Sequence, residues 1–474
     1  MNAAAHEATR PRLGWYGDDF TGATDTLAET ARTGLRSLLF LGVPTPRQLL
    51  RAGPLDAIGI AGAARGMAPE AMAAELRVVG RYMASAGVRV LHYKCCSTFD
   101  SAPHVGSIGA AIRELRRHMP NPLVPIVGGQ PSIGRYCSFA QLFARAGAAP
   151  EIHRIDRHPV MSAHPVTPMH EADLRLHLAA QGLPDILSVP HTAYPRLQQA
   201  ADAPLLNDWI DRLIDTANGP LLLDLVDDEQ LPIIGRLLWR AASCLPLLAV
   251  GPSSVQQALA RAAPAAVTAA VTTAEMSAAT AAGTAAGTDT GAGASATQSL
   301  PAASGPVLVV AGSLSPVTAR QVAACRQYQR QPLQVERLLR DPGYAAAQVR
   351  QAAAALARGI NVLAHTDRPT QALDAHQTAA TARATGQLVA DIVRASSQAG
   401  ARLSRIGIAG GDTSSQATLA LGIWGLAFRC VLAPGVTVSL TRSDDPATDG
   451  VELMLKGGQM GGDLLFDELA LGRA

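Results

Sequence analysis

Short apolar runs alternate with amphipathic stretches along the first half of the chain. The run LGWYG at 13–17 is typical of a buried strand, and TGATDTLAETARTG at 21–34 predicts a helix that ends at a glycine. A second helix is predicted at 69–87. Further apolar runs predict strands at 37–42, 57–62, 88–94, 122–129, 219–226 and 244–251. Strands that alternate with helices in this way build mainly parallel sheets.

The same alternation returns near the C-terminus. A strand is predicted at 306–313, with a helix starting at Pro316, and strand, glycine-rich turn and helix follow at 405–422. The segment between the two blocks, 263–305, is rich in Ala, Thr and Gly and has almost no large apolar side chains. It can therefore bury too little apolar surface to offset the loss of conformational entropy on folding. The sequence therefore predicts an α/β protein with two α/β domains and mainly parallel sheets. The expected divisions are an N-terminal domain at 11–262, a flexible segment at 263–305 and a C-terminal domain at 306–470.

Composition narrows the class of protein. The chain has 474 residues, more than one hydrophobic core ordinarily includes, so two domains are expected. Its net charge of +2 gives no reason to expect a nucleic-acid partner. Its six cysteines form no CxxC pair, so neither a disulfide framework nor a zinc knuckle is expected. The first residues lack the apolar core of a signal peptide, and no run approaches the roughly 18 apolar residues of a membrane span. We expect a cytoplasmic protein without a membrane partner.

Two adjacent acids, Asp18 and Asp19, follow the first predicted strand and precede a helix start. Ligands of parallel α/β sheets sit at the carboxyl ends of strands, so this position suits a functional site. The helix N-terminus partly offsets the repulsion between the two carboxylates. Helix capping by one aspartate is the alternative explanation, but a doubled acid is more than a cap requires.

The stretch KCCSTFDS at 94–101 also follows a predicted strand. Lys94 can hold an anion, Ser97 offers a hydroxyl and Asp100 adds a further acid. An ordinary turn built on these small polar residues is the alternative. Farther along, His158 and His164 each precede a proline, which keeps them extended. Their loop either presents imidazoles to an acidic ligand or is purely structural.

Three glycine-rich turns in the C-terminal block resemble a phosphate cradle: AGSLSPVT, AGGDTSS and KGGQMGG. The residues expected to hold phosphate there are Ser313, Ser315, Gly410, Gly411, Asp412, Thr413, Ser414, Lys456, Gly457 and Gly458. Asp412 is also expected to bind magnesium, directly or through water. None of the turns matches the P-loop or the GxGxxG dinucleotide fingerprint, which disfavours a P-loop kinase and a Rossmann dehydrogenase.

The motifs DDFTGATD, KCCSTFDS, HPVTPM, AGSLSPVT, AGGDTS and LKGGQMGG occur in this order, and the chain thereby resembles the four-carbon acid sugar kinase family. The resemblance spans roughly 13–262 and 306–468. It implies an N-terminal sugar-acid-binding domain, a C-terminal nucleotide-binding domain, and phosphorylation of erythronate, threonate or 3-oxo-tetronate with ATP and Mg²⁺. It also implies that Asp18, Asp19, Lys94 and Asp100 lie on the sugar-acid side.

One stretch departs from the family pattern. In GGQPSIGRYCSFAQLF at 128–143, Arg135 matches the family's arginine, but Tyr136 and Cys137 replace small polar residues. The sugar acid therefore stays open and includes branched or keto acids such as 3-oxo-isoapionate. In such a kinase one of the paired aspartates would take the hydroxyl proton while the other orients the hydroxyls. Lys94 and Arg135 would hold the substrate carboxylate.

Two other functions remain as alternatives to the kinase. A sugar-acid dehydrogenase would place a dinucleotide in the glycine-rich domain, but its fingerprint is missing. A non-enzymatic, two-lobed sugar-acid binding protein would not need the glycine turns. The sequence leaves the oligomeric state open and is compatible with a homodimer.

Overall fold

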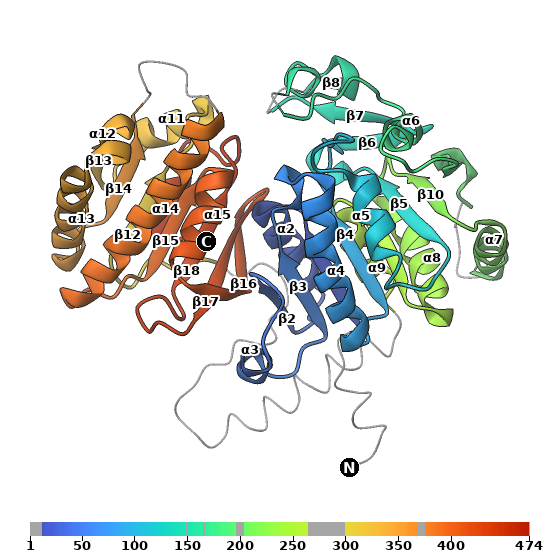
Figure 1. The fold of residues 1–474 in the computed structure, drawn as a ribbon, viewed down its shortest axis with the longest axis horizontal. Coiled ribbons are helices and arrows are strands. Elements are labelled where there is room, and N and C mark those ends of the chain that lie inside the picture. The colour runs from blue at the N-terminus through green and yellow to red at the C-terminus, as the bar shows by residue number, and fades with distance from the viewer. Residues whose placement is uncertain are drawn as a thin grey trace, which may run out of the picture. The chain divides into compact units, whose positions relative to one another are not determined.

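The computed structural model describes residues 12–147, 150–164, 166–195, 203–263, 299–367 and 375–473. The chain divides into a first unit, Met1–Ser37 with Thr45–Ser295, and a second unit, Leu38–Pro44 with Ala296–Ala474. Each unit has its own set of strands and helices (Figure 1). Most of the predicted flexible segment, residues 264–298, lies outside the described residues.

Parallel strands form the main sheet of the first unit. Their order is β3-β1-β4-β11-β5-β10-β9. The strands are β1 (Leu13–Gly17), β3 (Ala57–Ala61), β4 (Val90–Lys94), β5 (Val124–Gly128), β9 (Leu187–Val189), β10 (Pro220–Asp224) and β11 (Leu247–Gly251). The apolar runs predicted as strands in this part of the chain are confirmed. Strands β1, β3, β4, β5, β10 and β11 are buried along their length because helices cover the sheet.

Helices pack on both faces of this sheet, and β1 shows the two layers. The indole N–H of Trp15 donates to the carbonyl of Ala23 in α2, whereas a side chain at Gly14 would meet Met83 of α4. Helix α9 packs beside α2, and α5 beside α4. The helices are α2 (Phe20–Ala31), α3 (Pro46–Ala52), α4 (Pro69–Ala86), α5 (Ile108–Leu115), α6 (Leu174–Ala179), α7 (Ala203–Thr216), α8 (Leu231–Cys244) and α9 (Ser254–Arg261).

A small antiparallel sheet, β6 (Arg135–Ser138), β7 (Gln141–Arg145) and β8 (Ile152–Arg154), belongs to the same unit. The turn between β6 and β7 places Phe139 and Ala140 at positive φ, an unfavourable conformation for both residues. The buried carboxylate of Asp224, at the end of β10, accepts their backbone N–H groups at 2.5 and 3.0 Å. These bonds hold the turn against the carboxyl end of the main sheet.

The sheet of the second unit is parallel on one side and antiparallel on the other. Strands β13-β14-β12-β15-β18 are parallel neighbours, and β17, β16 and β2 continue the sheet with antiparallel pairing. The strands are β2 (Ser37–Phe40), β12 (Val307–Ala311), β13 (Gln329–Leu333), β14 (Val362–Thr366), β15 (Arg405–Ala409), β16 (Ile423–Ala433), β17 (Val436–Ser443) and β18 (Glu452–Lys456). The helices are α11 (Pro316–Ala324), α12 (Val335–Arg340), α13 (Pro342–Ala357), α14 (Ala375–Gln398), α15 (Gly411–Ala420) and α16 (Leu465–Leu471).

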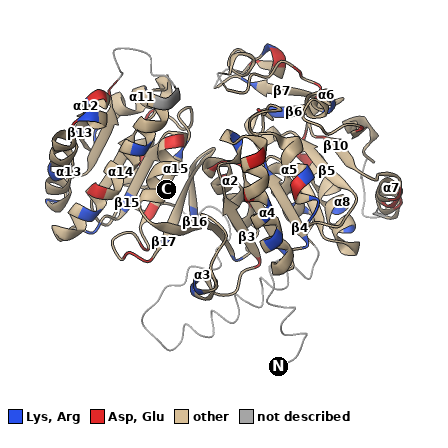
Figure 2. Ribbon diagram, viewed as in Figure 1, with Lys and Arg blue, Asp and Glu red and all other residues tan. Residues whose placement is uncertain are grey.

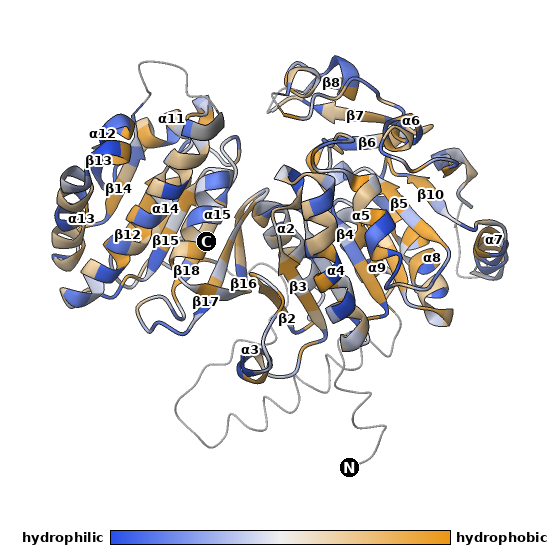
Figure 3. Ribbon diagram, viewed as in Figure 1, coloured by the Kyte–Doolittle hydropathy of each residue, from blue (hydrophilic) through white to orange (hydrophobic). Residues whose placement is uncertain are grey.

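Apolar residues concentrate on the central strands of both sheets (Figure 3), and most charged residues lie on the surrounding helices and loops (Figure 2). This distribution explains why the central strands appear in the sequence as nearly continuous apolar runs. Within the described part of the chain, no helix is both long and apolar enough to cross a membrane. The predicted fold class, α/β with mainly parallel sheets, is confirmed.

Candidate active site

The carboxyl ends of the first unit's strands meet along one edge of the sheet. Gly17 at the end of β1 pairs with Ala61 and Lys94, and Lys94 pairs with Gly251. Residues that directly follow these strands are therefore brought together, as in other open parallel sheets. The motifs predicted to carry chemistry in this unit begin here.

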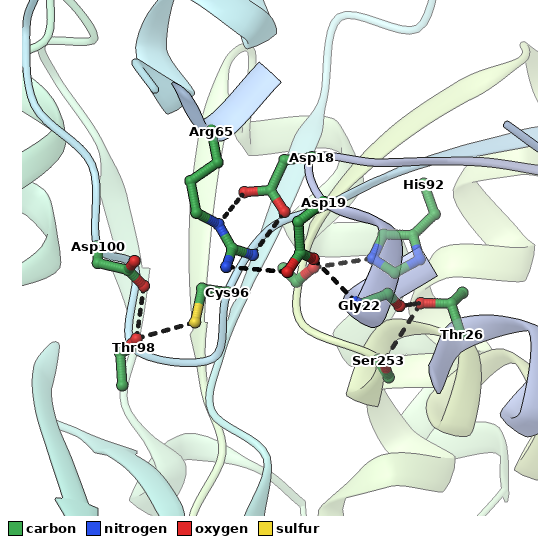
Figure 4. A network of polar contacts seen from close by, with 11 residues as sticks. Asp18, Asp19, Gly22, Thr26, Arg65, His92, Cys96, Thr98, Asp100 and Ser253 are labelled. Atoms are coloured by element: carbon green, nitrogen blue, oxygen red, sulfur yellow. Dashed lines mark hydrogen bonds and ion pairs between the residues drawn. The ribbon is translucent and has the colours of Figure 1, made fainter. Parts of the chain in front are cut away.

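One guanidinium compensates both members of the acid pair (Figure 4). Arg65 donates from Nε and Nη2 to the two carboxylate oxygens of Asp18 at 3.2 and 2.8 Å, and its Nη1 lies 3.1 Å from Asp19 Oδ2. Asp19 also caps α2, because its Oδ1 accepts the N–H of Gly22 at 2.8 Å. The capping explanation is thus correct for Asp19, but it leaves Asp18 and Arg65 unexplained.

The surroundings separate the two carboxylates electrostatically. Burial raises the pKa of Asp18, with Arg65 opposing it, and the Asp18 side chain is only 5% exposed. The pKa of Asp19 is lowered: burial alone would raise it, but Arg65, Lys94 and the Gly22 N–H favour the carboxylate. The Asp19 side chain is 31% exposed. Asp19 is therefore the more accessible member of the pair, and its surroundings favour the carboxylate form.

Lys94 is a buried cation at the end of β4. A Cβ atom on Gly22 would fall 2.4 Å from its Nζ, which places the ammonium against the first turn of α2. Burial opposes the charge, but Asp19 and Asp18 outweigh it and raise the pKa of Lys94. Only 5% of Lys94 is exposed. This buried ammonium, which two nearby carboxylates stabilise, is a candidate donor to a substrate oxygen at the end of β4.

The loop after Lys94 adds a short chain of polar groups. Thr98 Oγ1 donates to Asp100 Oδ1 at 2.6 Å and lies 2.9 Å from the thiol of Cys96 (Figure 4). Ser97 is buried in the same turn. These contacts agree with the alternative that the small polar residues simply build a turn. They also fix the Asp100 side chain in the loop that follows β4.

Arg135, at the start of β6, has one half of its guanidinium engaged. Its Nη1 donates to the carbonyls of Ile133, Gly134 and Arg145 at 3.1 to 3.2 Å. Its Nε is buried without a partner among the described residues, and burial lowers the pKa of the side chain. The Nε–H is therefore a donor without a protein acceptor among the described residues, and it lies on the guanidinium edge that can bind a carboxylate side-on.

The two loop histidines bond to nearby backbone and side-chain groups. His158 Nδ1 accepts the N–H groups of Val160 and Met161, both at 3.1 Å, and burial lowers its pKa. His164 Nδ1 accepts the N–H of Thr167 at 3.1 Å. These bonds shape the loop, so contact with a sugar acid stays a prediction for both residues.

In the second unit the three glycine turns also meet at one edge, because Ala409 pairs with both Ala311 and Lys456. The turns are packed closely enough to exclude side chains. A Cβ atom on Gly312 would fall 2.3 Å from Thr413 Oγ1, and one on Gly458 would fall 2.4 Å from Ser313 Oγ. The predicted cradle residues are thus brought together within this unit.

The two helix N-termini at this edge differ. Ser315 caps α11, accepting the N–H of Thr318 at 3.1 Å, whereas the N-cap residue of α15 is Gly410, which offers no side-chain cap. Gly411 and Asp412 are exposed in its first turn, and a Cβ atom on Gly411 would meet nothing within 4 Å. Thr413 and Ser414 follow as buried residues, and Ser414 Oγ has no partner among the described groups. An uncapped, accessible helix start suits an anion such as phosphate.

Lys456 points into the second unit. Its Nζ is wholly buried, donates to Thr318 Oγ1 at 2.9 Å and lies 3.4 Å from the carbonyl of Gly458, which Ser315 also bonds. Burial lowers the pKa of Lys456 to about 8. In this arrangement the ammonium ties the turn at Gly457 and Gly458 to α11.

The carboxylate of Asp412 suits a metal ion that is coordinated jointly by the protein and by a bound ligand. Asp412 lies in the uncapped turn of α15, where a phosphate-bound cation could use it. Across the described ranges no three His, Cys, Asp or Glu side chains gather as a ready-made metal centre. Phosphate and water oxygens would therefore complete the coordination of any magnesium ion.

Arg65 is the site residue that the sequence analysis missed. It lies 47 positions from Asp18, in a short turn after β3, within AGAARGM. No motif marks this arginine. The one available signal was its place directly after a predicted strand, where the other candidates also lie.

Comparisons with known proteins identify related chains. Residues 13–259 match the model of a sugar-binding N-terminal domain, and residues 308–466 match that of a nucleotide-binding C-terminal domain. The chain is 36% identical to the 3-oxo-isoapionate kinase of Paraburkholderia graminis, covering 97% of this chain and 94% of that protein. It is 30% identical to the 3-oxo-tetronate kinase of Cupriavidus necator, with 97% of each covered. A crystal structure of Haemophilus influenzae protein HI1011 shares the fold, with a TM-score of 0.69 and 23% identity over 96% of this chain and 99% of that one.

Proposed function

This chain belongs to the family of sugar-acid kinases that join a sugar-binding N-terminal domain to a nucleotide-binding C-terminal domain, and we propose that its acceptor is a 3-oxo sugar acid. The reaction moves the γ-phosphoryl group of ATP to a substrate hydroxyl, leaving ADP and releasing the hydroxyl proton. Greater identity to the 3-oxo-isoapionate kinase than to the 3-oxo-tetronate kinase favours the branched acid.

The observation that carries the acidic substrate is the buried guanidinium of Arg135, whose Nε has no partner among the described residues. A buried, unpartnered guanidinium nitrogen favours a ligand that brings a negatively charged oxygen. Lys94, whose charge Asp19 and Asp18 stabilise, is a second candidate for contact with the acid.

Asp19 is the proposed base. Its accessible carboxylate can orient the acceptor hydroxyl and take its proton as the bond to phosphorus forms. The lowered pKa keeps the Asp19 carboxylate ionised, and a weak base is sufficient because phosphoryl transfer depends more on alignment than on a strong base. Asp18, buried against Arg65, supports Asp19 instead of touching the substrate.

The nucleotide side is assigned to the second unit. The N–H groups at the start of α15 and the packed turns at Gly312, Gly410 and Gly458 would hold the phosphates. Asp412 would share a magnesium ion with them, and that ion neutralises phosphate charge when bound.

A coupled ADP-release assay over a panel of sugar acids tests the proposal. We expect ATP-dependent turnover with 3-oxo-isoapionate and slower turnover with 3-oxo-tetronate, threonate and erythronate. Fluorescence titration with NADH on the same sample examines the dehydrogenase alternative. Absence of ADP release with every acid, or oxidation of an acid by a dinucleotide, would overturn the proposed function.

A further inference from the structure

Arg65 contacts the acid pair through all three of its guanidinium nitrogens. Nε and Nη2 bind the two oxygens of Asp18, and Nη1 reaches Asp19 Oδ2. The backbone N–H of Arg65 also donates to the Asp18 carbonyl at 3.1 Å, so the start of the side chain is fixed to the same residue. Because both the backbone and the guanidinium of Arg65 bond to Asp18, the side chain has little rotational freedom.

These bonds leave the catalytic carboxylate partly free. Asp19 Oδ1 accepts one bond from Gly22 and Oδ2 one contact from Arg65. Each carboxylate oxygen can accept two bonds, so acceptor positions remain for a substrate hydroxyl. Asp18, by contrast, directs both oxygens toward Arg65 and is buried.

We propose that Arg65 is a positioning residue for phosphoryl transfer: anchored on the buried Asp18, its guanidinium keeps Asp19 ionised and aimed at the acceptor hydroxyl. This inference rests on the proposed kinase function. It gives each partner a distinct task, since Asp18 fixes the arginine, the arginine fixes Asp19, and Asp19 contacts the substrate. A purely structural ion pair would contribute to stability alone.

The charges around Asp19 set the expected pH behaviour. Arg65 from the turn after β3 and Lys94 from β4 favour its carboxylate, and Asp18 from the end of β1 opposes it. Removal of the guanidinium should therefore raise the pKa of Asp19. A base acts only when ionised, so the acidic limb of the kcat profile should move to higher pH.

The test compares Arg65→Gln, Arg65→Lys and a matched control, Arg36→Gln. Arg36 binds Asp56 in the same bidentate way, with its Nε and Nη2 at 2.9 and 2.7 Å from the two carboxylate oxygens. Asp56 directly precedes β3, whereas Arg65 follows it, so this ion pair lies at the other end of the strand. For Arg65→Gln we expect kcat to fall by roughly 100-fold, the size typical of a misplaced catalytic group, with the acidic limb shifted upward. Arg65→Lys should restore the limb but only part of the rate, because it restores charge without the fork. Arg36→Gln should change neither.

A second readout works without turnover. Carbon-13 NMR titration of the Asp19 carboxyl should show a higher pKa in Arg65→Gln than in wild type. If Arg65→Gln does not fold, the Asp18→Asn/Arg65→Gln double variant, which removes the buried charge as well, takes its place in both measurements. A kcat and acidic limb like those of wild type, or an unshifted Asp19 titration, would overturn the inference. If wild type releases no ADP with any acid, the kinase proposal fails while the titration still decides the role of Arg65.

Discussion

Asp19→Asn separates the two tasks that the structure gives this residue. Asparagine caps helices as well as aspartate does, so the bond from Gly22 should survive the change. The lost ion pair with Arg65 is partly buried, since the Asp19 side chain is 31% exposed, so the free energy of unfolding should fall by about 1–3 kcal/mol. The lost base should lower turnover by at least about 100-fold, since general-base catalysis contributes roughly 10²–10⁴-fold.

The assays are coupled ADP release for turnover and urea denaturation for stability. Asp19→Ala should lose the same turnover and about 1 kcal/mol more stability, because it also loses the cap. Thr45→Ala is the matched control: it removes the cap of α3, where Thr45 accepts the N–H of Gln48, and should leave turnover unchanged. An Asp19→Asn enzyme that turns over at nearly the wild-type rate would refute the base assignment and make Asp100 the next candidate.

Three further changes probe the rest of the account. Gly411→Val should fold normally, since its Cβ meets nothing within 4 Å, yet lose ATP affinity by calorimetry; unchanged affinity would remove the α15 turn from the nucleotide site. Lys94→Met should raise the KM for the sugar acid at least about tenfold while the KM for ATP stays constant, and equal effects on both would contradict its role as the acid's partner. Lys456 loses its proton at a lower pH in the folded state than in the unfolded state, so folding stability should rise as the pH increases from about 8 toward 10.5. Thermal melts of Lys456→Met should lack this rise. A rise of the same size in the variant would show that another group titrates.

The sequence predicted those features that depend on local pattern. The buried strands β1, β3 and β12 appear as apolar runs because helices cover them on both faces. The positions of Asp18 and Asp19 directly after β1 are equally local, and the ends of neighbouring parallel strands necessarily lie together. The acid pair and Lys94 could therefore be predicted as neighbours.

Long-range contacts account for what was missed. Arg65 meets Asp18 across 47 positions, and no spacing rule links a turn arginine to an acid on another strand. Lys456 also makes a long-range contact that the sequence does not show, because its ammonium donates to Thr318, 138 positions away; its contact with phosphate stays a prediction. Likewise, no local signal shows that Leu39 and Phe40 pair with β16 in the second unit.

The central claim is that the chain moves a phosphoryl group from ATP to a 3-oxo sugar acid, and phosphorus-31 NMR of the reaction tests it most directly. With 3-oxo-isoapionate, ATP and Mg²⁺, we expect a new phosphate monoester signal that grows in step with ADP, and Asp19→Asn should nearly abolish it. Loss of the γ-phosphate signal into inorganic phosphate alone, or no consumption of ATP with any acid of the panel, would contradict the kinase activity proposed for this chain.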